Sequence, residues 1–166
     1  AQQGDWELVF LGDSITHGWE RNGKTTWDKY YGARKAINLG FGGDRTEHVL
    51  WRLNHGELDG YKPRVVVIMI GTNNTGHDMH PPEAIAAGIK KIIATIQKKS
   101  PDTKVLLLGI FPRGATTDDP KRVNNDNTNA LISTMADEKR IFYININNMF
   151  LTEDGVLTKE IMPDLL

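Results

Sequence analysis

One short stretch of this sequence brings together residue types that suit nucleophilic chemistry. Gly12-Asp13-Ser14 follows the apolar run Leu8-Val9-Phe10-Leu11, which predicts a short buried strand. Ser14 then lies just past the carboxyl end of that strand, at the edge where open α/β sheets bind ligands. A serine there can act as a nucleophile, and its backbone N–H, near a helix start, favours developing negative charge. The alternative is that Ser14 only caps a helix, as most serines after a strand do.

Two further strand ends carry groups that could serve the same reaction. Gly42-Gly43 follows the predicted strand 36–39, and Asn73 follows the predicted strand 65–70. Each is by itself typical of a turn or loop. In a parallel sheet, however, the three strand ends share one edge and can face one cleft. Acyl transfer needs a hydroxyl nucleophile with donors aimed at the oxyanion. We therefore predict Ser14 as the nucleophile, with the backbone N–H groups of Ser14 and Gly43 and the Asn73 amide as the oxyanion hole.

The elements that must position these residues alternate along the chain. Strand-like apolar runs are separated by helical patterns, which is typical of βαβ units and a parallel sheet. We expect five strands in the order 2-1-3-4-5, and a single domain over residues 1–166 with no repeat or linker. After the fifth strand we expect loop, with at most a helical turn near Lys159. The expected strands are 8–11, 36–39, 65–70, 105–110 and 141–146, and the expected helices are 25–32, 45–53, 82–99 and one that begins at Pro120.

Composition excludes several classes of protein. The chain has 166 residues, of which 39% are hydrophobic and 25% charged, as in an ordinary globular domain. Its net charge of −1 gives no field to attract nucleic acid, so we expect no nucleic-acid partner. The absence of cysteine excludes disulfides, thiolate metal sites and a cysteine nucleophile. The longest apolar run, 65–70, is far too short to span a membrane. The compartment stays open.

At the level of motifs, the sequence resembles the SGNH (GDSL-type) hydrolases, a family of flavodoxin-like serine esterases. Within that family it is similar to the branch containing the catalytic subunits of brain-type platelet-activating-factor acetylhydrolase. The resemblance covers nearly the whole chain from Trp6 onward. The matching blocks are Gly12-Asp13-Ser14, residues 38–46 and Gly71-Thr72-Asn73-Asn74, with residues 48–53 and Pro112-Arg113-Gly114 matching the branch.

The resemblance implies a fold, a reaction and a substrate class. The fold is a three-layer sheet with helices on both faces. Ser14 is the implied nucleophile, and Gly43 and Asn73 are the implied oxyanion donors. The implied reaction removes short acyl groups, acetyl above all, from a small-molecule ester of a carbohydrate or lipid alcohol, without cofactor or metal. The assembly is not fixed by the sequence, and a homodimer stays open.

One block of the family is incomplete. Its Asp-x-x-His supplies an acid and a general base three residues apart, and here Pro163-Asp164-Leu165-Leu166 fits its first part. The resemblance makes Asp164 the acid and places the base just beyond Leu166. We therefore expect that the chain as written lacks the C-terminal end of the domain, with the catalytic histidine and last helix, and is a poor esterase. Asp13 adjoins the nucleophile too closely to orient a shared imidazole, so we expect it to support the turn.

Three further features of the sequence bear on other interpretations. The missing histidine favours a non-catalytic relative that binds an acetylated sugar, or an inactive shortened form, whereas Ser14, Gly43 and Asn73 favour an enzyme. Gly40-Phe41-Gly42-Gly43 resembles a dinucleotide-binding loop, but Arg45 stands where the third glycine is needed. His77-Asp78-Met79-His80 lacks a third ligand at a suitable spacing, so we expect no metal.

Overall fold

The five predicted strands form one sheet in the computed structural model, which describes residues 6–166. All four strand pairs are parallel and the order is β2-β1-β3-β4-β5, which confirms the predicted topology. The strands are β1 (Leu8–Gly12), β2 (Ala36–Gly40), β3 (Val65–Met69), β4 (Lys104–Leu108) and β5 (Ile141–Ile144).

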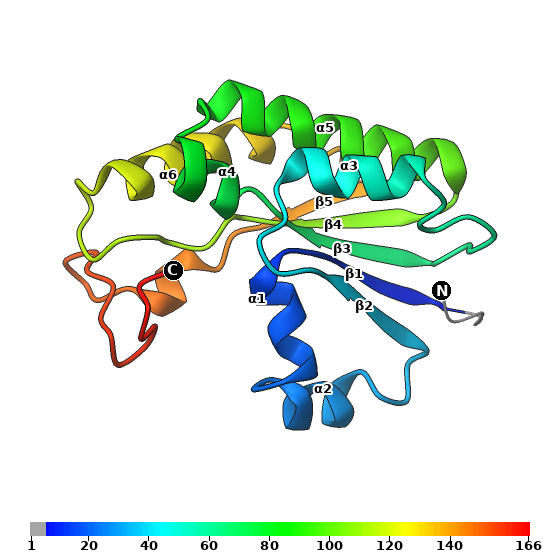
Figure 1. The fold of residues 1–166 in the computed structure, drawn as a ribbon, viewed down its shortest axis with the longest axis horizontal. Helices are drawn as coiled ribbons and strands as arrows, with labels where there is room; N and C mark the ends of the chain where they lie inside the picture. Colours follow the sequence, from blue (N-terminus) through cyan, green and yellow to red (C-terminus); the bar gives the residue numbers. More distant parts are fainter. Residues whose placement is uncertain (1–5) are drawn as a thin grey trace.

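Helices cover both faces of this sheet, giving the expected three layers (Figure 1). Three longer helices and the short α4 lie on one face, and the short α1 and α2 lie on the other. Within the described residues, no helix is both long and apolar enough to cross a bilayer. The first group is α3 (Thr46–Asn54), α4 (Thr72–Asp78), α5 (Pro82–Lys99) and α6 (Pro120–Ser133), and the second is α1 (Ser14–His17) and α2 (Lys24–Tyr30).

The main core lies between the sheet and α3, α5 and α6. Helix α5 contributes one continuous apolar stripe, as its 3.6-residue period predicts. Strand β3 is apolar on both sides, as a central strand covered on both faces must be. This core fixes the central strands and therefore the edge at which they end. The buried α5 residues are Ile85, Ile89, Ile92, Ile93 and Ile96.

The opposite face carries an aromatic cluster instead of an aliphatic core. Phe10 of β1 packs edge-to-face on Trp27 and Tyr31, with ring centroids 5.0 and 4.8 Å away. Trp19 packs against the same two rings, whereas Tyr30 is 52% exposed. These contacts hold α2 and the 3-10 turn Gly18–Glu20 on the sheet. Packing therefore accounts for Trp19 and Trp27. Beside the cluster, a cavity of about 480 Å³ borders β1, β3 and β4.

Helix α6 differs from α5 because most of the side chains that it buries are polar. It begins at Pro120, as predicted, but its Val123 and Leu131 are largely exposed. The buried Asn129 instead bonds both backbone groups of Ile110, accepting from the N–H at 2.7 Å and donating to the carbonyl at 2.8 Å. These bonds satisfy backbone groups where β4 has ended. A periodic pattern of apolar residues cannot predict a helix whose buried face is mostly polar.

Candidate active site at the strand ends

The ends of β1, β2 and β3 lie side by side. Gly12 is opposite Gly40 of β2 on one side and Met69 of β3 on the other. The Phe41 N–H donates to the Gly12 carbonyl at 3.2 Å, so the chain leaving β2 stays against β1. A side chain on Gly40 would come within 2.4 Å of the His17 nitrogen, which shows how closely α1 approaches β2. The turn carrying Ser14 and the loop carrying Gly43 thus start from adjacent positions.

Ser14 is exposed at the first position of α1. The residue that caps this helix is Asp13, whose Oδ1 accepts a hydrogen bond from the Ile15 N–H at 3.0 Å. The alternative that Ser14 serves as the N-cap is therefore wrong. At the first helical position the Ser14 N–H lies among those that lack an intrahelical acceptor. Its side chain and its backbone donor are both free of a capping role.

Asp13 supports this turn from beneath. Its side chain is only 1% exposed. Burial raises the pKa of Asp13 to about 7, and the nearby Asp44 carboxylate acts in the same direction. The positive charge of Arg113 opposes this rise. Its geometry as a capping acceptor agrees with the turn-supporting role predicted for it.

The loop after β2 presents Gly43 in a tight turn. The Asp44 N–H donates to the Phe41 carbonyl at 3.2 Å, which closes a four-residue turn over 41–44. Gly43 is the third residue of that turn with a φ of 81°, the left-handed conformation a type II turn needs there. Among residues 6–166 the Gly43 N–H has no acceptor, and the space beside its Cα is open. The N–H is thus available to a ligand.

Two consecutive asparagines join α4 to this loop. The Asn73 Nδ2 donates to the Asp44 carbonyl at 2.8 Å, and the side chain is 6% exposed. A side-chain amide carries two N–H donors, so one remains for a ligand. Asn74 is fully buried and its Oδ1 accepts from the Thr46 N–H at 3.0 Å, which anchors the start of α3. The pair thus fixes the chain that follows Gly43, at Asp44 and at Thr46.

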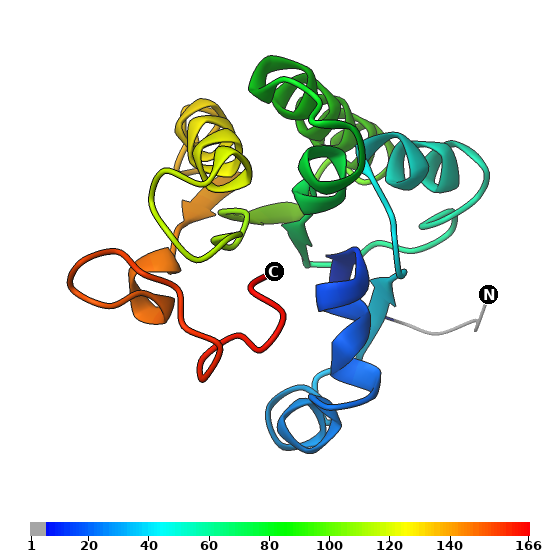
Figure 2. The ribbon, with the colours of Figure 1, turned by 60° about the vertical axis from the view of Figure 1, so that its left-hand side comes forward.

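Asp164, the predicted acid, lies on the C-terminal segment, which returns toward α1 (Figures 1 and 2). It is exposed, and its Oδ1 accepts from the Leu166 N–H at 3.2 Å. Arg113 interacts electrostatically with both Asp164 and Asp13. Desolvation lowers the pKa of Arg113, and this is opposed by the charges of Asp119, Asp164 and Asp13. The guanidinium therefore lies near both Asp13 and Asp164.

None of the five histidines hydrogen-bonds or pairs with Ser14 or Asp164 in the part of the chain that the structure describes. His17 faces Glu20, with 3.8 Å between Nε2 and Oε2. The His48 Nδ1 accepts from the Arg45 N–H at 3.1 Å. The other three are His55, His77 and His80, of which His55 stacks on Trp51 and His80 contacts Asn74. These partners agree with the sequence pattern, which matches none of the five to the family's base.

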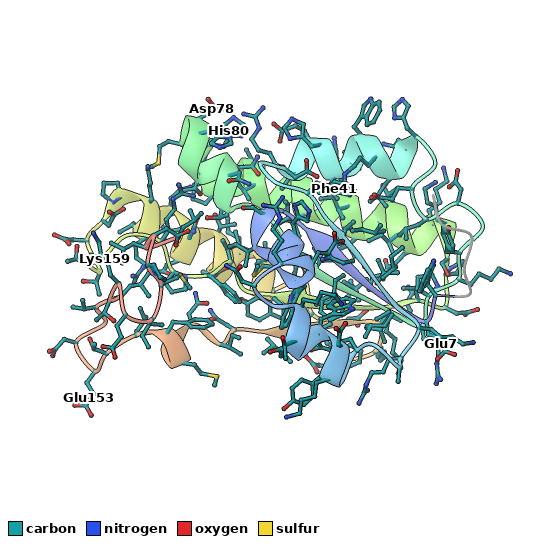
Figure 3. The ribbon with its side chains drawn as sticks, turned by 60° about the horizontal axis from the view of Figure 1, so that its bottom comes forward. Glu7, Phe41, Asp78, His80, Glu153 and Lys159 are labelled. Carbon is teal, nitrogen blue, oxygen red and sulfur yellow. The ribbon has the colours of Figure 1, made fainter. Side chains whose placement is uncertain are left out.

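The His77-Asp78-Met79-His80 segment, for which we expect no metal, makes local polar contacts. Asp78, at the end of α4, and His80 lie side by side (Figure 3), with 3.7 Å between Nε2 and Oδ2. Asp78 also pairs with Arg45. Over residues 6–166 no group of three or more histidine, cysteine, aspartate or glutamate side chains is arranged to hold a metal.

Comparison with known proteins places this geometry in a family. Residues 10–166 match the model of the GDSL-like Lipase/Acylhydrolase family. The chain belongs to this family. It is 36% identical over 164 residues to platelet-activating factor acetylhydrolase IB subunit alpha1 of Bos taurus, covering 96% of this chain and 67% of that protein. It is 34% identical over 161 residues to the alpha2 subunit of Rattus norvegicus, covering 96% and 68%. The resemblance to SGNH hydrolases is thereby confirmed.

Solved structures show the same fold. An acetylxylan esterase from Geobacillus stearothermophilus superposes with a TM-score of 0.67 at 17% identity, covering 99% of this chain and 93% of that one. A GDSL-like lipase from Bacteroides thetaiotaomicron gives a TM-score of 0.65 at 23% identity, covering 99% and 88%. Membership of the GDSL-like Lipase/Acylhydrolase family supports a hydrolase.

Two arginines near the site were not among the predicted site residues. Arg113 donates from Nη1 to the carbonyl and hydroxyl of Thr72, at 3.0 and 3.1 Å, and so fixes the start of α4. Arg52 of α3 donates from Nε and Nη2 to the Asp44 Oδ2 at 3.1 and 2.7 Å. Both arginines fall in blocks that match the family branch. That match was the available signal, because Arg113 acts on Thr72 across 41 positions and the direction of Arg52 depends on how α3 packs.

Proposed function

We propose that this protein is a serine carboxyl-ester hydrolase that removes short acyl groups, acetyl above all, through an acyl-Ser14 intermediate. The observation that carries the proposal is the pair of bonds joining three strand ends. The Phe41 N–H to Gly12 carbonyl bond connects the Gly43 loop with the Ser14 turn, and the Asn73 amide bonds the Asp44 carbonyl. A nucleophile and two kinds of N–H donor are thus built onto adjacent backbone segments.

The proposed reaction has two steps. The Ser14 Oγ attacks the ester carbonyl carbon, and its proton passes to a general base. The Ser14 and Gly43 N–H groups and the Asn73 amide donate to the oxyanion that forms. As the intermediate collapses, the alcohol leaves with the proton, and water then releases the acid from Ser14 by the same route. Asp164 is the proposed acid that orients the imidazole of that base.

Acetyl esters of carbohydrates or lipids are the proposed substrates. The relatives support this class, since they include platelet-activating factor acetylhydrolase subunits and an acetylxylan esterase. The alcohol is left open between these two classes. The experiment is hydrolysis of p-nitrophenyl acetate by the wild type and by Ser14→Ala, each with and without added imidazole.

The expected result is a rate that depends on Ser14 and rises with imidazole, because no described histidine contacts Ser14. An enzyme that lacks one triad member still retains about 10³–10⁴-fold catalysis over water. Equal rates for the wild type and Ser14→Ala in both conditions would contradict the proposed serine hydrolase activity.

The alternative is a relative that binds acetyl esters without cleaving them. The absence of a histidine contact to Ser14 within residues 6–166 is the observation that favours it. Binding of an acetylated sugar, measured by calorimetry, without Ser14-dependent turnover in either condition would select this alternative.

A further inference from the structure

The loop that carries Gly43 is held by a residue of the next helix, eight positions after Asp44. Arg52, on α3, donates through Nε and Nη2 to one oxygen of Asp44, at 3.1 and 2.7 Å. Its Nη1 bonds Glu57 on the other side. The Arg52 and Asp44 side chains are each 15% exposed. At this degree of burial the pair is less screened by solvent than a surface pair.

The same guanidinium also contacts the first residue of the turn. Its Cζ lies 4.3 Å from the centroid of the Phe41 ring, within the range of a cation–π interaction. Arg52 thus contacts both ends of the 41–44 turn, namely the ring of Phe41 and the carboxylate of Asp44. The planar, forked guanidinium fixes direction as well as distance, which an ammonium group would not do. Gly43 lies between these two residues and has no side chain that could make a stabilising contact.

Asp44 links this clamp to the Asn73 amide. While its carboxylate accepts from Arg52, its backbone carbonyl accepts from the Asn73 Nδ2 at 2.8 Å. A rotation of Asp44 would move the carbonyl that orients the amide. Arg52 and Phe41 line a cavity of about 760 Å³ beside β2, and Ser14, Gly43 and Asn73 are not among its lining residues. The arginine is therefore placed to act through the loop, not on the reacting atoms.

We propose that Arg52 is a positioning residue for the oxyanion hole, holding the 41–44 turn through Phe41 and Asp44 so that the Gly43 N–H and the Asn73 amide keep the direction the transition state needs. This inference rests on the proposed function, and it assigns to α3 a part in the reaction without contact with the substrate.

The experiment compares Arg52→Gln, Asp44→Ala, the double variant and Arg52→Lys with the wild type. Lys99→Gln, which breaks the ion pair to Asp59 far from the strand ends, is the matched control. Turnover of p-nitrophenyl acetate is measured in the presence of imidazole. In parallel, ¹⁵N relaxation reports the order parameter of the Gly43 amide.

For Arg52→Gln we expect kcat to fall by about 10- to 100-fold, less than the loss of a whole oxyanion donor, with KM almost unchanged. The double variant should be no worse than the worse single variant, since both act through one contact. Arg52→Lys should recover only part of kcat. The Gly43 order parameter should fall from about 0.85, typical of rigid backbone, in Arg52→Gln and stay unchanged in Lys99→Gln.

Two results would overturn the proposal. One is a lower melting temperature for Arg52→Gln with kcat of the folded protein unchanged, which would make the ion pair merely structural. The other is additive losses in the double variant, which would separate Arg52 from Asp44. If the wild type shows no Ser14-dependent turnover, the proposed function fails. The Gly43 order parameter in Arg52→Gln then tests the positioning role by itself: a lowered value supports it, and an unchanged value contradicts it.

Discussion

The two sides of the proposed site are held in different ways. On one side, Asp13, Asn73 and Asn74 are buried, and the two asparagines bond backbone groups of the loop after β2 and of α3. On the other side, Asp164 is exposed, and its Oδ1 accepts from the Leu166 N–H of its own turn. The segment that carries it is tied to the rest by the Gly114 N–H, which donates to the Leu165 carbonyl at 2.9 Å.

This difference separates groups that the sheet holds in place from a carboxylate that an exposed loop carries. The proposed nucleophile and oxyanion donors follow strands β1, β2 and β3, whose register holds their backbone segments in place. Such preorganised donors are the largest single contribution in many enzymes. A carboxylate on an exposed loop, in contrast, gains its role only when an imidazole contacts it. The buried side should therefore be sensitive to substitution, and the exposed side insensitive.

The largest effect is expected for Asn73→Ala. Loss of one oxyanion donor lowers kcat by about 10²–10³-fold in an enzyme of this chemistry. The measurement is turnover of p-nitrophenyl acetate with imidazole present, at equal amounts of folded protein. Asn124→Ala is the control, because Asn124 also bonds α4, through the Thr75 hydroxyl and the His80 carbonyl, but does not touch the Gly43 loop. Equal losses in the two variants would contradict a specific role for Asn73.

A smaller effect, on stability, is expected for Asp13→Asn. The folded pKa of Asp13, about 7, lies above the ordinary value of 3.8, so the folded state holds the proton more tightly between these values. The free energy of unfolding of the wild type should therefore decrease as pH rises through this window, by a few kcal/mol from this group, and then level off. Asparagine keeps the capping acceptor for the Ile15 N–H but does not titrate.

Urea unfolding of both proteins across this window provides the measurement. Because all other groups titrate in both, the difference between the two curves isolates Asp13. The variant should gain stability relative to the wild type as pH rises. Two parallel curves would mean that Asp13 is not buried as described.

The smallest effect is expected for Asp164→Asn. Its neighbour Arg113 provides an exposed charge interaction, which contributes at most about 1 kcal/mol, so turnover should change by less than about fivefold. When an imidazole is in place, the same change in a triad lowers kcat by about 10⁴-fold. A loss of that size here would show that one of the five histidines moves to Asp164 during catalysis.

Much of this architecture could be predicted from local patterns. The isoleucine stripe of α5 and the apolar run of β3 set the layers, and the five strand ends then set where ligands bind. The short helices α1 and α4 could not be predicted, because four and seven residues are too few to show an apolar period. Pro120 predicted where helix α6 begins, but its buried asparagines bond backbone groups of the residues just after β4, and no apolar period indicates such bonds.

The site could be predicted in part for a similar reason. Ser14, Gly43 and Asn73 follow strands directly, so their sequence positions place them at the sheet edge. Arg52 acts on Asp44 across the turn between β2 and α3, and its direction depends on how α3 packs. That packing depends on tertiary contacts, which local sequence patterns do not predict. The only sign of Arg52 in the sequence was that it falls in a block matching the family branch.

The most direct test is to locate the acyl group on the protein. The full chain is incubated with p-nitrophenyl acetate, quenched in acid, digested and analysed by mass spectrometry. Acetyl on the peptide that contains Ser14, absent from Ser14→Ala and reduced in Asn73→Ala, is the predicted result. Acetylation that is unchanged in Ser14→Ala, or found only on surface lysines, would contradict the acyl-serine mechanism.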